Sequence, residues 1–281
     1  MLGSLFALVS ALGAAIPPCG DLPGVNRLWS NSRVRFILAG EMHGTNETPA
    51  IFGDLVCAAG TSNRPIVVGI EHSVADQEAI DAFMSSSDHE AAVRTLLSRR
   101  TWTTFDGRSS GAMLILFEKL RALKARGQIA EVVAFDDSRS GEDPATGEAR
   151  MAAAMMAAAD RRPNALVIAL TGNVHASKRV FPEIGSYPLM AMLLPPAETL
   201  SLFVADRGGE AWNGMNDGCG PTPWALRAGF AAAWFYQKAK ELWPAMTAGY
   251  RQACERAPHS PPFPTLHRRL LVQPIESKHA G

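Results

Sequence analysis

The sequence has no excess of charge of either sign, because its 27 lysine and arginine residues are balanced by 27 aspartate and glutamate residues. Lysine and arginine also form no cluster longer than a pair. Proteins that bind nucleic acids normally present a basic face to the phosphates, so a nucleic-acid partner is not expected. A small-molecule or peptide substrate is the better expectation for this neutral chain.

The sequence also lacks an apolar run of the about 20 residues that a membrane-spanning helix needs. The longest such run lies at residues 2–16 and ends in small residues of the kind that a signal peptidase accepts. We therefore expect residues 1–16 to be a signal peptide and the mature protein to be periplasmic or secreted, with no spanning segment. No lysine or arginine precedes the run, so an N-terminal helix packed on the body stays open as the alternative.

Cysteine is scarce, with four residues, and none of them forms a Cys-x-x-Cys pair. This excludes a thioredoxin-like redox motif and gives no support to a cysteine-based zinc site. In an exported protein a bridge between Cys219 and Cys254 would stabilise a C-terminal region that is rich in glycine and proline. The alternative is four unpaired thiols.

Apolar residues make up 47% of the 281 positions, which is enough for the core of one large domain. Apolar runs alternate with helical patterns, and this order predicts an α/β fold with a mostly parallel sheet flanked by helices on both faces. The domain is expected to span 17–281, with its core at about 33–205 and an aromatic-rich, helical and loop appendage at about 206–264. The predicted strands are 33–40, 65–71, 129–135, 166–170, 189–194, 200–204 and 270–272; the helices are 49–59, 74–84, 89–99, 109–126, 147–159 and 224–250; the loops are 138–146, 207–223 and 258–264.

Two predicted helices carry terminal signals. Asp88 is a suitable N-cap for the helix at 89–99, since its side chain can accept from the first free amides. Gly127 is a natural end for the helix at 109–126.

Polar side chains follow four of the predicted strands. The residue pairs at these ends are Glu41 and His43, Glu71 and His72, Asp136 and Asp137, and Asn173 and His175. Ligands of parallel α/β sheets bind beyond the carboxyl ends of the strands. The four ends therefore predict a single polar site, although each of them alone is ordinary turn chemistry.

The first strand end holds a carboxylate and an imidazole on one rigid segment. Glu41 and His43 are two residues apart and would project to the same side of a strand, whereas His72 would face away from Glu71 into the core. A second histidine, His175, follows a glycine at the same Gly-x-x-His spacing. Glu41, His43, Glu71 and His175 are thus candidate ligands of a divalent metal, or an acid–base set around a water. The alternative is that both histidines only cap strands.

Three motifs carry a family resemblance: the run Gly-Glu-Met-His-Gly-Thr-Asn-Glu at 40–47, Gly-Ile-Glu at 69–71 and Gly-Asn-Val-His at 172–175. Together they resemble the superfamily of erythromycin esterases, Tiki/TraB-type metalloproteases and ChaN-like haem-binding proteins. The resemblance implies an α/β fold with its site at the strand ends. It also implies acidic roles for Glu41 and Glu71, a role for His43 as the general base or first metal ligand, and His175 as the second histidine.

The chain departs from the esterase pattern at two places. Only one residue separates Glu41 from His43, where esterases have two, and this shorter spacing is that of the ChaN-like branch. The arginine that esterases place soon after the first motif is absent, and Arg108 is the most attractive substitute. It would fix a substrate carboxylate or phosphate with two hydrogen bonds; the alternative is a solvated residue near a helix start.

These observations favour a hydrolase that acts on an ester or peptide-like bond, with or without a divalent metal ion. Its catalytic residues would be Glu41, His43, Glu71, His175 and Arg108. The alternative is a ChaN-like protein that binds haem or another small ligand without catalysis. Because the sequence offers histidines but no haem motif, the hydrolase is preferred.

Overall fold

A computed structural model describes residues 19–104, 106–182, 185–205, 209–213, 220–224 and 271–274. Several predictions concern segments outside these ranges. They are the signal peptide at 1–16, the bridge between Cys219 and Cys254, the helix at 224–250 beyond its first residue, and the loop at 258–264.

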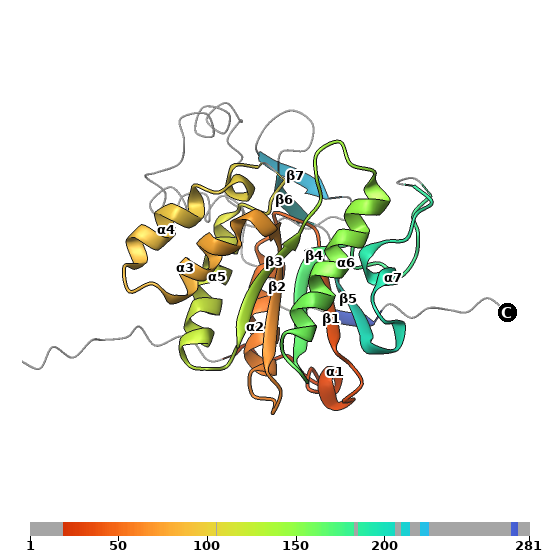
Figure 1. The fold of residues 1–281 in the computed structure, drawn as a ribbon, viewed down its shortest axis with the longest axis horizontal. Helices are drawn as coiled ribbons and strands as arrows, with labels where there is room; N and C mark the ends of the chain where they lie inside the picture. Colours follow the sequence, from red (N-terminus) through yellow and green to blue (C-terminus); the bar gives the residue numbers. More distant parts are fainter. Residues whose placement is uncertain are drawn as a thin grey trace, which may run out of the picture.

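A six-stranded sheet in the order β3-β2-β4-β1-β5-β8 forms the centre of the fold (Figure 1). Five strands are parallel, and β8 pairs antiparallel with β5 at the edge. All residues of β1 and β4 are buried, as expected for strands covered on both faces. The predicted α/β fold is therefore confirmed. The strands of this sheet are β1 (Phe36–Glu41), β2 (Ile66–Ser73), β3 (Glu131–Asp136), β4 (Leu166–Gly172), β5 (Thr199–Ala205) and β8 (Leu271–Pro274).

Helices cover both faces of the sheet, and the strands supply alternate residues to each face. Ile37 belongs to the core cluster that contains residues of α2, α3, α4 and α5, whereas Leu38 belongs to the cluster formed with α6 and α7. No helix of the described residues is long and apolar enough to cross a membrane. The helical elements are α1 (Arg27–Ser30), α2 (Glu47–Ala59), η1 (Val74–Asp76), α3 (Gln77–Ser85), α4 (His89–Leu97), η2 (Arg100–Thr103), α5 (Gly111–Ala125), α6 (Pro144–Asp160), α7 (Met190–Leu193) and η3 (Pro196–Glu198).

The predicted helix signals are confirmed at two termini. Asp88 accepts a hydrogen bond from the amide of Ala91 at 3.0 Å and so caps α4. Gly127, with φ +72°, follows Arg126, the C-cap of α5. The start of α6 was predicted three residues too late, because Pro144 is its first residue and Asp143 caps it. The Asp-Pro pair inside the predicted loop was the overlooked start signal.

Two other segments differ from their predictions. Residues 189–194 were predicted as a strand, but they contain the single helical turn α7. A short apolar run has no periodicity that separates a buried strand from a buried turn. Residues 207–223 were predicted as a loop, yet they contain most of an antiparallel pair, β6 (Gly209–Asn213) with β7 (Gly220–Trp224).

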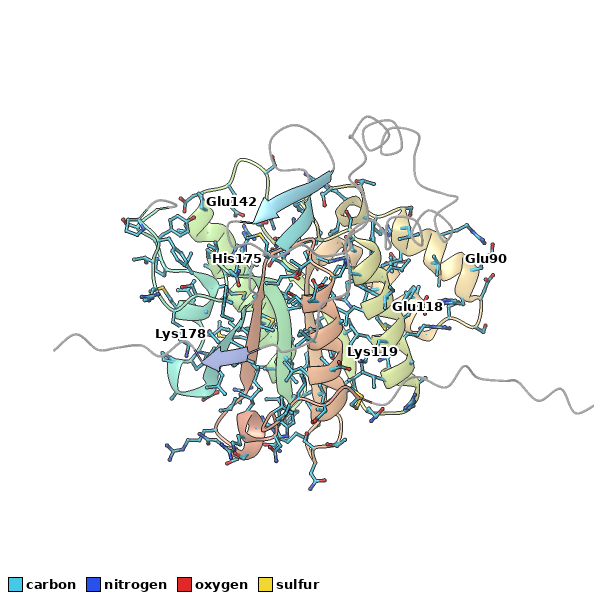
Figure 2. The ribbon with its side chains drawn as sticks, turned by 180° about the vertical axis from the view of Figure 1, so that it is seen from behind. Glu90, Glu118, Lys119, Glu142, His175 and Lys178 are labelled. Atoms are coloured by element: carbon cyan, nitrogen blue, oxygen red, sulfur yellow. A yellow bond between two sulfur atoms is a disulfide. The ribbon has the colours of Figure 1, made fainter. Side chains whose placement is uncertain are left out.

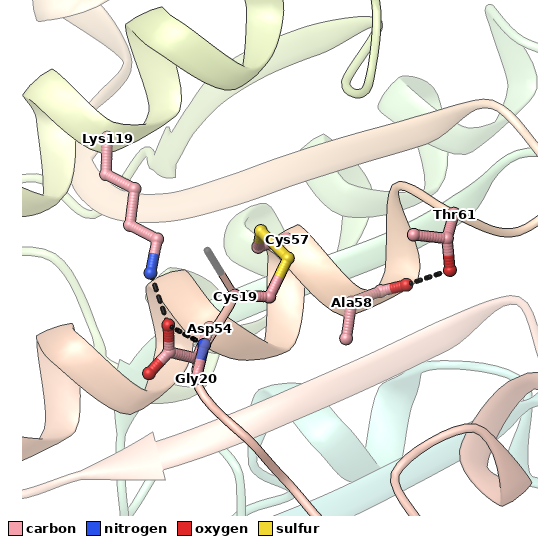
Figure 3. The surroundings of a disulfide bond; sticks show 7 residues. All are labelled: Cys19, Gly20, Asp54, Cys57, Ala58, Thr61 and Lys119. Atoms are coloured by element: carbon pink, nitrogen blue, oxygen red, sulfur yellow. Dashed lines mark hydrogen bonds and ion pairs between the residues drawn. A yellow bond between two sulfur atoms is a disulfide. The ribbon is translucent and has the colours of Figure 1, made fainter. Parts of the chain in front are cut away.

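The first described residues are attached to helix α2 by a disulfide between Cys19 and Cys57 (Figure 3). Next to it, the amide of Gly20 donates to Oδ1 of Asp54 at 2.9 Å, and Lys119 forms an ion pair with the same carboxylate. The alternative of four unpaired thiols is therefore wrong for this pair. Disulfides persist in oxidising compartments, so this one supports the predicted periplasmic or secreted location, which stays a prediction.

Candidate functional site

Four neighbouring strands bring their carboxyl ends to one edge of the sheet. The register pairs Glu41 of β1 with Gly172 of β4, and Ile70 of β2 with Leu170 of β4. The residues that follow these positions leave the sheet side by side, although they are far apart in the sequence. Ligands of parallel α/β sheets bind at this edge, as the predicted site requires.

The two predicted histidines lie at this edge and face the same carboxylate oxygen. Nε2 of His43 lies 3.4 Å from Oε1 of Glu71, and Nε2 of His175 lies 3.7 Å from the same atom. The opposite nitrogen of His43 donates to Oε1 of Glu41 at 2.9 Å. The structure therefore gathers all four residues of the predicted set into one cluster.

Glu71 lies at the centre of the cluster and is almost entirely buried, with 6% of its surface exposed. Its Oε2 accepts hydrogen bonds from the hydroxyl of Thr171 and the amide of Gly172, both at 2.6 Å. Burial alone would raise the pKa of Glu71, but the neighbouring His175 and His43 hold it well below the ordinary range. Glu71 is therefore an ionised carboxylate that both imidazoles share.

Glu41 and His43 form a coupled pair. Burial would lower the pKa of His43, but Glu71 and the hydrogen bond to Glu41 raise it to about 10. Burial raises the pKa of Glu41, and its Oε2 has no hydrogen-bond partner among the described residues. At neutral pH His43 is thus a proton donor, held between two carboxylates.

His175 has a carboxylate partner that was not predicted. Its Nδ1 donates to Oε1 of Glu148 on α6 at 2.7 Å. Burial would lower the pKa of His175, yet Glu71 and Glu148 raise it. Each imidazole of the site therefore has its Nδ1 fixed by one glutamate and its Nε2 directed at Glu71.

Arg108 lies under the site, but its donors are already engaged by protein carboxylates. Nη1 donates to Asp136 at 2.7 Å and lies 3.4 Å from Oε1 of Glu71, while Nε and Nη2 donate to Asp106 at 3.0 and 2.7 Å. Its guanidinium is thus paired with protein carboxylates, and the predicted contact with a substrate anion stays a prediction. The solvated alternative is wrong, since only 19% of the side chain is exposed. Arg108 instead places its positive charge next to the carboxylate of Glu71.

Two glycines determine how closely the parts of the site approach. A Cβ added to Gly107 would lie 2.5 Å from the amide nitrogen of Gly44 and 2.6 Å from the carbonyl carbon of His43, so the loop before α5 packs directly on the loop after β1. A Cβ at Gly172 would lie 3.2 Å from Nε2 of His43 and 3.5 Å from Cδ2 of His175. The absence of a side chain at Gly172 thus allows both imidazoles to pack closely on the end of β4.

The predicted core role of His72 is confirmed. The residue is fully buried, its Nε2 lies 3.2 Å from the carbonyl oxygen of Arg108, and its ring contacts Trp102 and Phe117. Burial lowers the pKa of His72 to about 3, so the ring is neutral. It supports the backbone of Arg108 rather than reacting.

Sequence reasoning missed Glu148 and Asp106 as site residues. Glu148 lies within the predicted helix 147–159, which is rich in alanine and methionine, and nothing in its spacing connects it to His175. Asp106 precedes Arg108 by two residues, but a single acid in a loop carries no signal of a site. The one available signal was Glu148 itself, a charged residue on a helix that packs against the sheet, because glutamate is rarely buried without a partner.

The predicted metal set was Glu41, His43, Glu71 and His175. Among the residues that the structure describes, no group of three or more histidine, cysteine, aspartate or glutamate residues is arranged to hold a metal ion. The two Nε2 atoms converge on a carboxylate oxygen, and Glu41 lies behind His43 at Nδ1. The set does not fit a closed cage as it stands, and metal binding stays a prediction that metal analysis can test.

No protein-family model matches the chain, and neither a curated protein nor a solved structure matches it. The resemblance to the erythromycin esterase, Tiki/TraB and ChaN-like superfamily therefore stays a prediction that rests on the three motifs. What the site can do chemically follows from its geometry.

Proposed function

We propose that this protein is a hydrolase that cleaves an ester or peptide-like bond by acid–base catalysis between two histidines. One observation carries the proposal: Nε2 of His43 and Nε2 of His175 face the same oxygen of Glu71, at 3.4 and 3.7 Å. Two imidazoles oriented in this way can act on opposite ends of one reaction. A pair of strand caps would have no reason to share a buried carboxylate.

The two histidines would have different roles. The pKa of His43 is about 10, so His43 is the acid that protonates the leaving group. His175 is assigned as the base: when its ring is neutral, Nε2 takes a proton from water, while Glu71 and Glu148, which raise its pKa, stabilise the imidazolium that forms. The resulting hydroxide adds to the carbonyl carbon, the bond to the leaving oxygen or nitrogen breaks, and the leaving group receives the proton from Nε2 of His43.

Glu71 would complete the cycle. Its Oε1 lies between the two Nε2 atoms, so the proton gained by His175 can return to His43 through this carboxylate. The negative charge of Glu71 also stabilises each imidazolium that forms. The resemblance implied a basic role for His43, whereas the two carboxylates at its nitrogens favour the acidic role.

The substrate is expected to bind at the sheet edge where the two imidazoles lie, next to Gly172. Arg108 is paired with protein carboxylates, so a neutral or cationic small molecule or peptide is the better match to this part of the site. Five carboxylates surround the two imidazoles and this guanidinium. They are Glu41, Glu71, Asp106, Asp136 and Glu148.

The experiment is a hydrolysis assay with nitrophenyl esters, lactones and fluorogenic peptides. H43A and H175A are expected to lower kcat at least ~100-fold, the usual contribution of one acid or base. G172A is expected to lower kcat as well, because its methyl group would lie against Nε2 of His43. H89A is the control, since His89 forms a similar pair with Glu118 at 2.8 Å on the surface. Wild-type rates in both site-histidine variants, or no hydrolysis of the whole panel, would overturn the proposal.

Metal analysis and a haem titration separate the alternatives. If chelation leaves the activity intact, the metal-independent mechanism is supported; if it removes a stoichiometric divalent ion together with the activity, that mechanism is wrong and the two histidines act as ligands. The haem-binding alternative requires a stoichiometric Soret shift that H43A abolishes. The contacts of both imidazoles are with carboxylates, whereas haem needs a broad apolar slot.

A further inference from the structure

The two carboxylate oxygens of Glu148 accept hydrogen bonds from two different parts of the chain. Oε1 accepts from Nδ1 of His175 at 2.7 Å, and Oε2 accepts from the backbone amide of Met190, the first residue of α7, at 2.6 Å. Only 5% of Glu148 is exposed. A buried carboxylate with two short, charge-assisted hydrogen bonds is a strong and geometrically specific connection.

We propose that Glu148 is a positioning residue, which orients the imidazole of His175 and joins it to α7 through the amide of Met190. The role in catalysis rests on the hydrolase function proposed above. The contacts that carry the inference lie outside the strand-end motifs, on a helix that packs across the sheet.

The bond from Nδ1 determines which nitrogen of His175 is left for chemistry. With Nδ1–H donated to Glu148, Nε2 is directed at Glu71 and can exchange a proton. Glu41 does the same for His43, but from only two residues away, at the end of β1. His175 depends instead on a helix residue 27 positions earlier, so its orientation depends on how α6 packs against the sheet.

The α7 turn reinforces this orientation from the other side. The amide of Ala191 donates to the carbonyl oxygen of His175 at 3.0 Å, one residue after Met190 donates to Glu148. Side chain and backbone of His175 are therefore held by α6 and α7 together. Residues 189–194, which sequence patterns predicted as a strand, have a specific role as this helical turn.

Replacing Glu148 with glutamine gives a precise test of the arrangement. Glutamine keeps the shape and one oxygen acceptor, but its amide nitrogen cannot accept a hydrogen bond. One of the two donors, Nδ1 of His175 or the amide of Met190, must lose its partner. We expect E148Q to lower kcat about 10- to 100-fold with little change in KM, as for partners that orient a reactive histidine. E142Q is the control, because Glu142 binds Arg150 of the same helix and lies at the same end of the molecule as His175 (Figure 2).

Two measurements report on the proposal without any activity. In NMR spectra of protein with ¹⁵N-labelled histidine, E148Q should shift the Nδ1 resonance of His175 and leave that of His89 unchanged. Hydrogen exchange at the amide of Met190 should become faster. M190P and M190A form a second pair, because both remove the methionine side chain, but proline also removes the amide donor, at a position where it suits a helix start, whereas alanine keeps it. Exchange at Ala191 and the Nδ1 signal should change more in M190P than in M190A.

The outcomes separate the two proposals. Unchanged Nδ1 and Met190 signals in E148Q, with wild-type kcat, would overturn the positioning role while the hydrolase stands. If the wild-type protein hydrolyses nothing in the panel, the function fails, and the NMR and exchange data still decide whether Glu148 holds His175. If E148Q keeps the wild-type kcat while E142Q loses activity, the positioning role of Glu148 is also refuted.

Discussion

Substituting Gly107 with alanine tests whether the loop before α5 must touch the loop after β1. Gly107 has φ +90°, and a Cβ at this position would lie 2.5 Å from the amide nitrogen of Gly44 and 2.6 Å from the carbonyl carbon of His43. Both neighbours are backbone atoms and cannot rotate away. The methyl group must therefore push residue 107 off the backbone of His43, and Arg108 moves with it.

The free-energy cost of G107A has two parts. The left-handed backbone conformation costs a residue other than glycine about 1–2 kcal/mol. Forcing a methyl group into a closely packed contact adds about 1–3 kcal/mol. Gly127 provides the matched control, since its φ is +72° but a Cβ there would meet nothing within 4 Å. G127A should therefore show only the first part, and the difference of about 1–3 kcal/mol is the contribution of the loop contact.

The assay is urea denaturation of both variants, combined with the hydrolysis assay. We expect G107A to be less stable than G127A by this difference and to lose activity, because the contacts of Arg108 with Glu71 and Asp136 depend on the same loop. G127A should retain wild-type activity. Equal stability of the two variants, or full activity in G107A, would show that the packing of Gly107 on His43 does not matter to the site.

Two further predictions concern the disulfide and the pH dependence of stability. Removing both Cys19 and Cys57 opens a loop with a sequence separation of 38, so the free energy of unfolding should fall by about 4 kcal/mol; a loss below about 1 kcal/mol in urea denaturation would contradict this reasoning. The pKa of His43 is raised from 6.5 to about 10, so its protonation stabilises the fold fully below pH 6.5, and this stabilisation is lost as the pH rises through about 10. Unfolding measured from pH 7 to pH 10 should show this loss in the wild-type protein and not in H43A, whereas the low pKa of Glu71 acts only in acid.

Much of the fold could be predicted because parallel strands that are buried on both faces appear as continuous apolar runs. The runs that became β1, β2 and β4 lie inside the sheet, between other strands. The prediction failed at 189–194, where an apolar run of similar length forms a helical turn and the tertiary contact with Glu148 decides the structure. The disulfide also escaped prediction, because cysteine spacing does not reveal pairing.

The strand-end residues of the site could be predicted for a similar reason. Once the strands are parallel, Glu41, Glu71 and His175 must emerge at one edge, whatever their separation in the sequence. Glu148 could not be found in this way, because it lies on helix α6, and packing against the sheet decides which side of that helix faces the site. The partners of Arg108 were not predicted either, since carboxylates from a loop and a strand reach its donors only in the folded protein.

Glu71, rather than the Glu41–His43 pair, emerges as the residue on which the geometry of the site depends. Glu41 touches one imidazole, whereas Glu71 contacts both imidazoles, Arg108 and the backbone of β4. Leaving a buried carboxylate unpaired destabilises the fold strongly, so Glu71 and its hydrogen-bond donors fix one another's positions. Each histidine then needs a second carboxylate to hold its remaining nitrogen. This explains why the site contains more acids than the strand-end motifs alone predict.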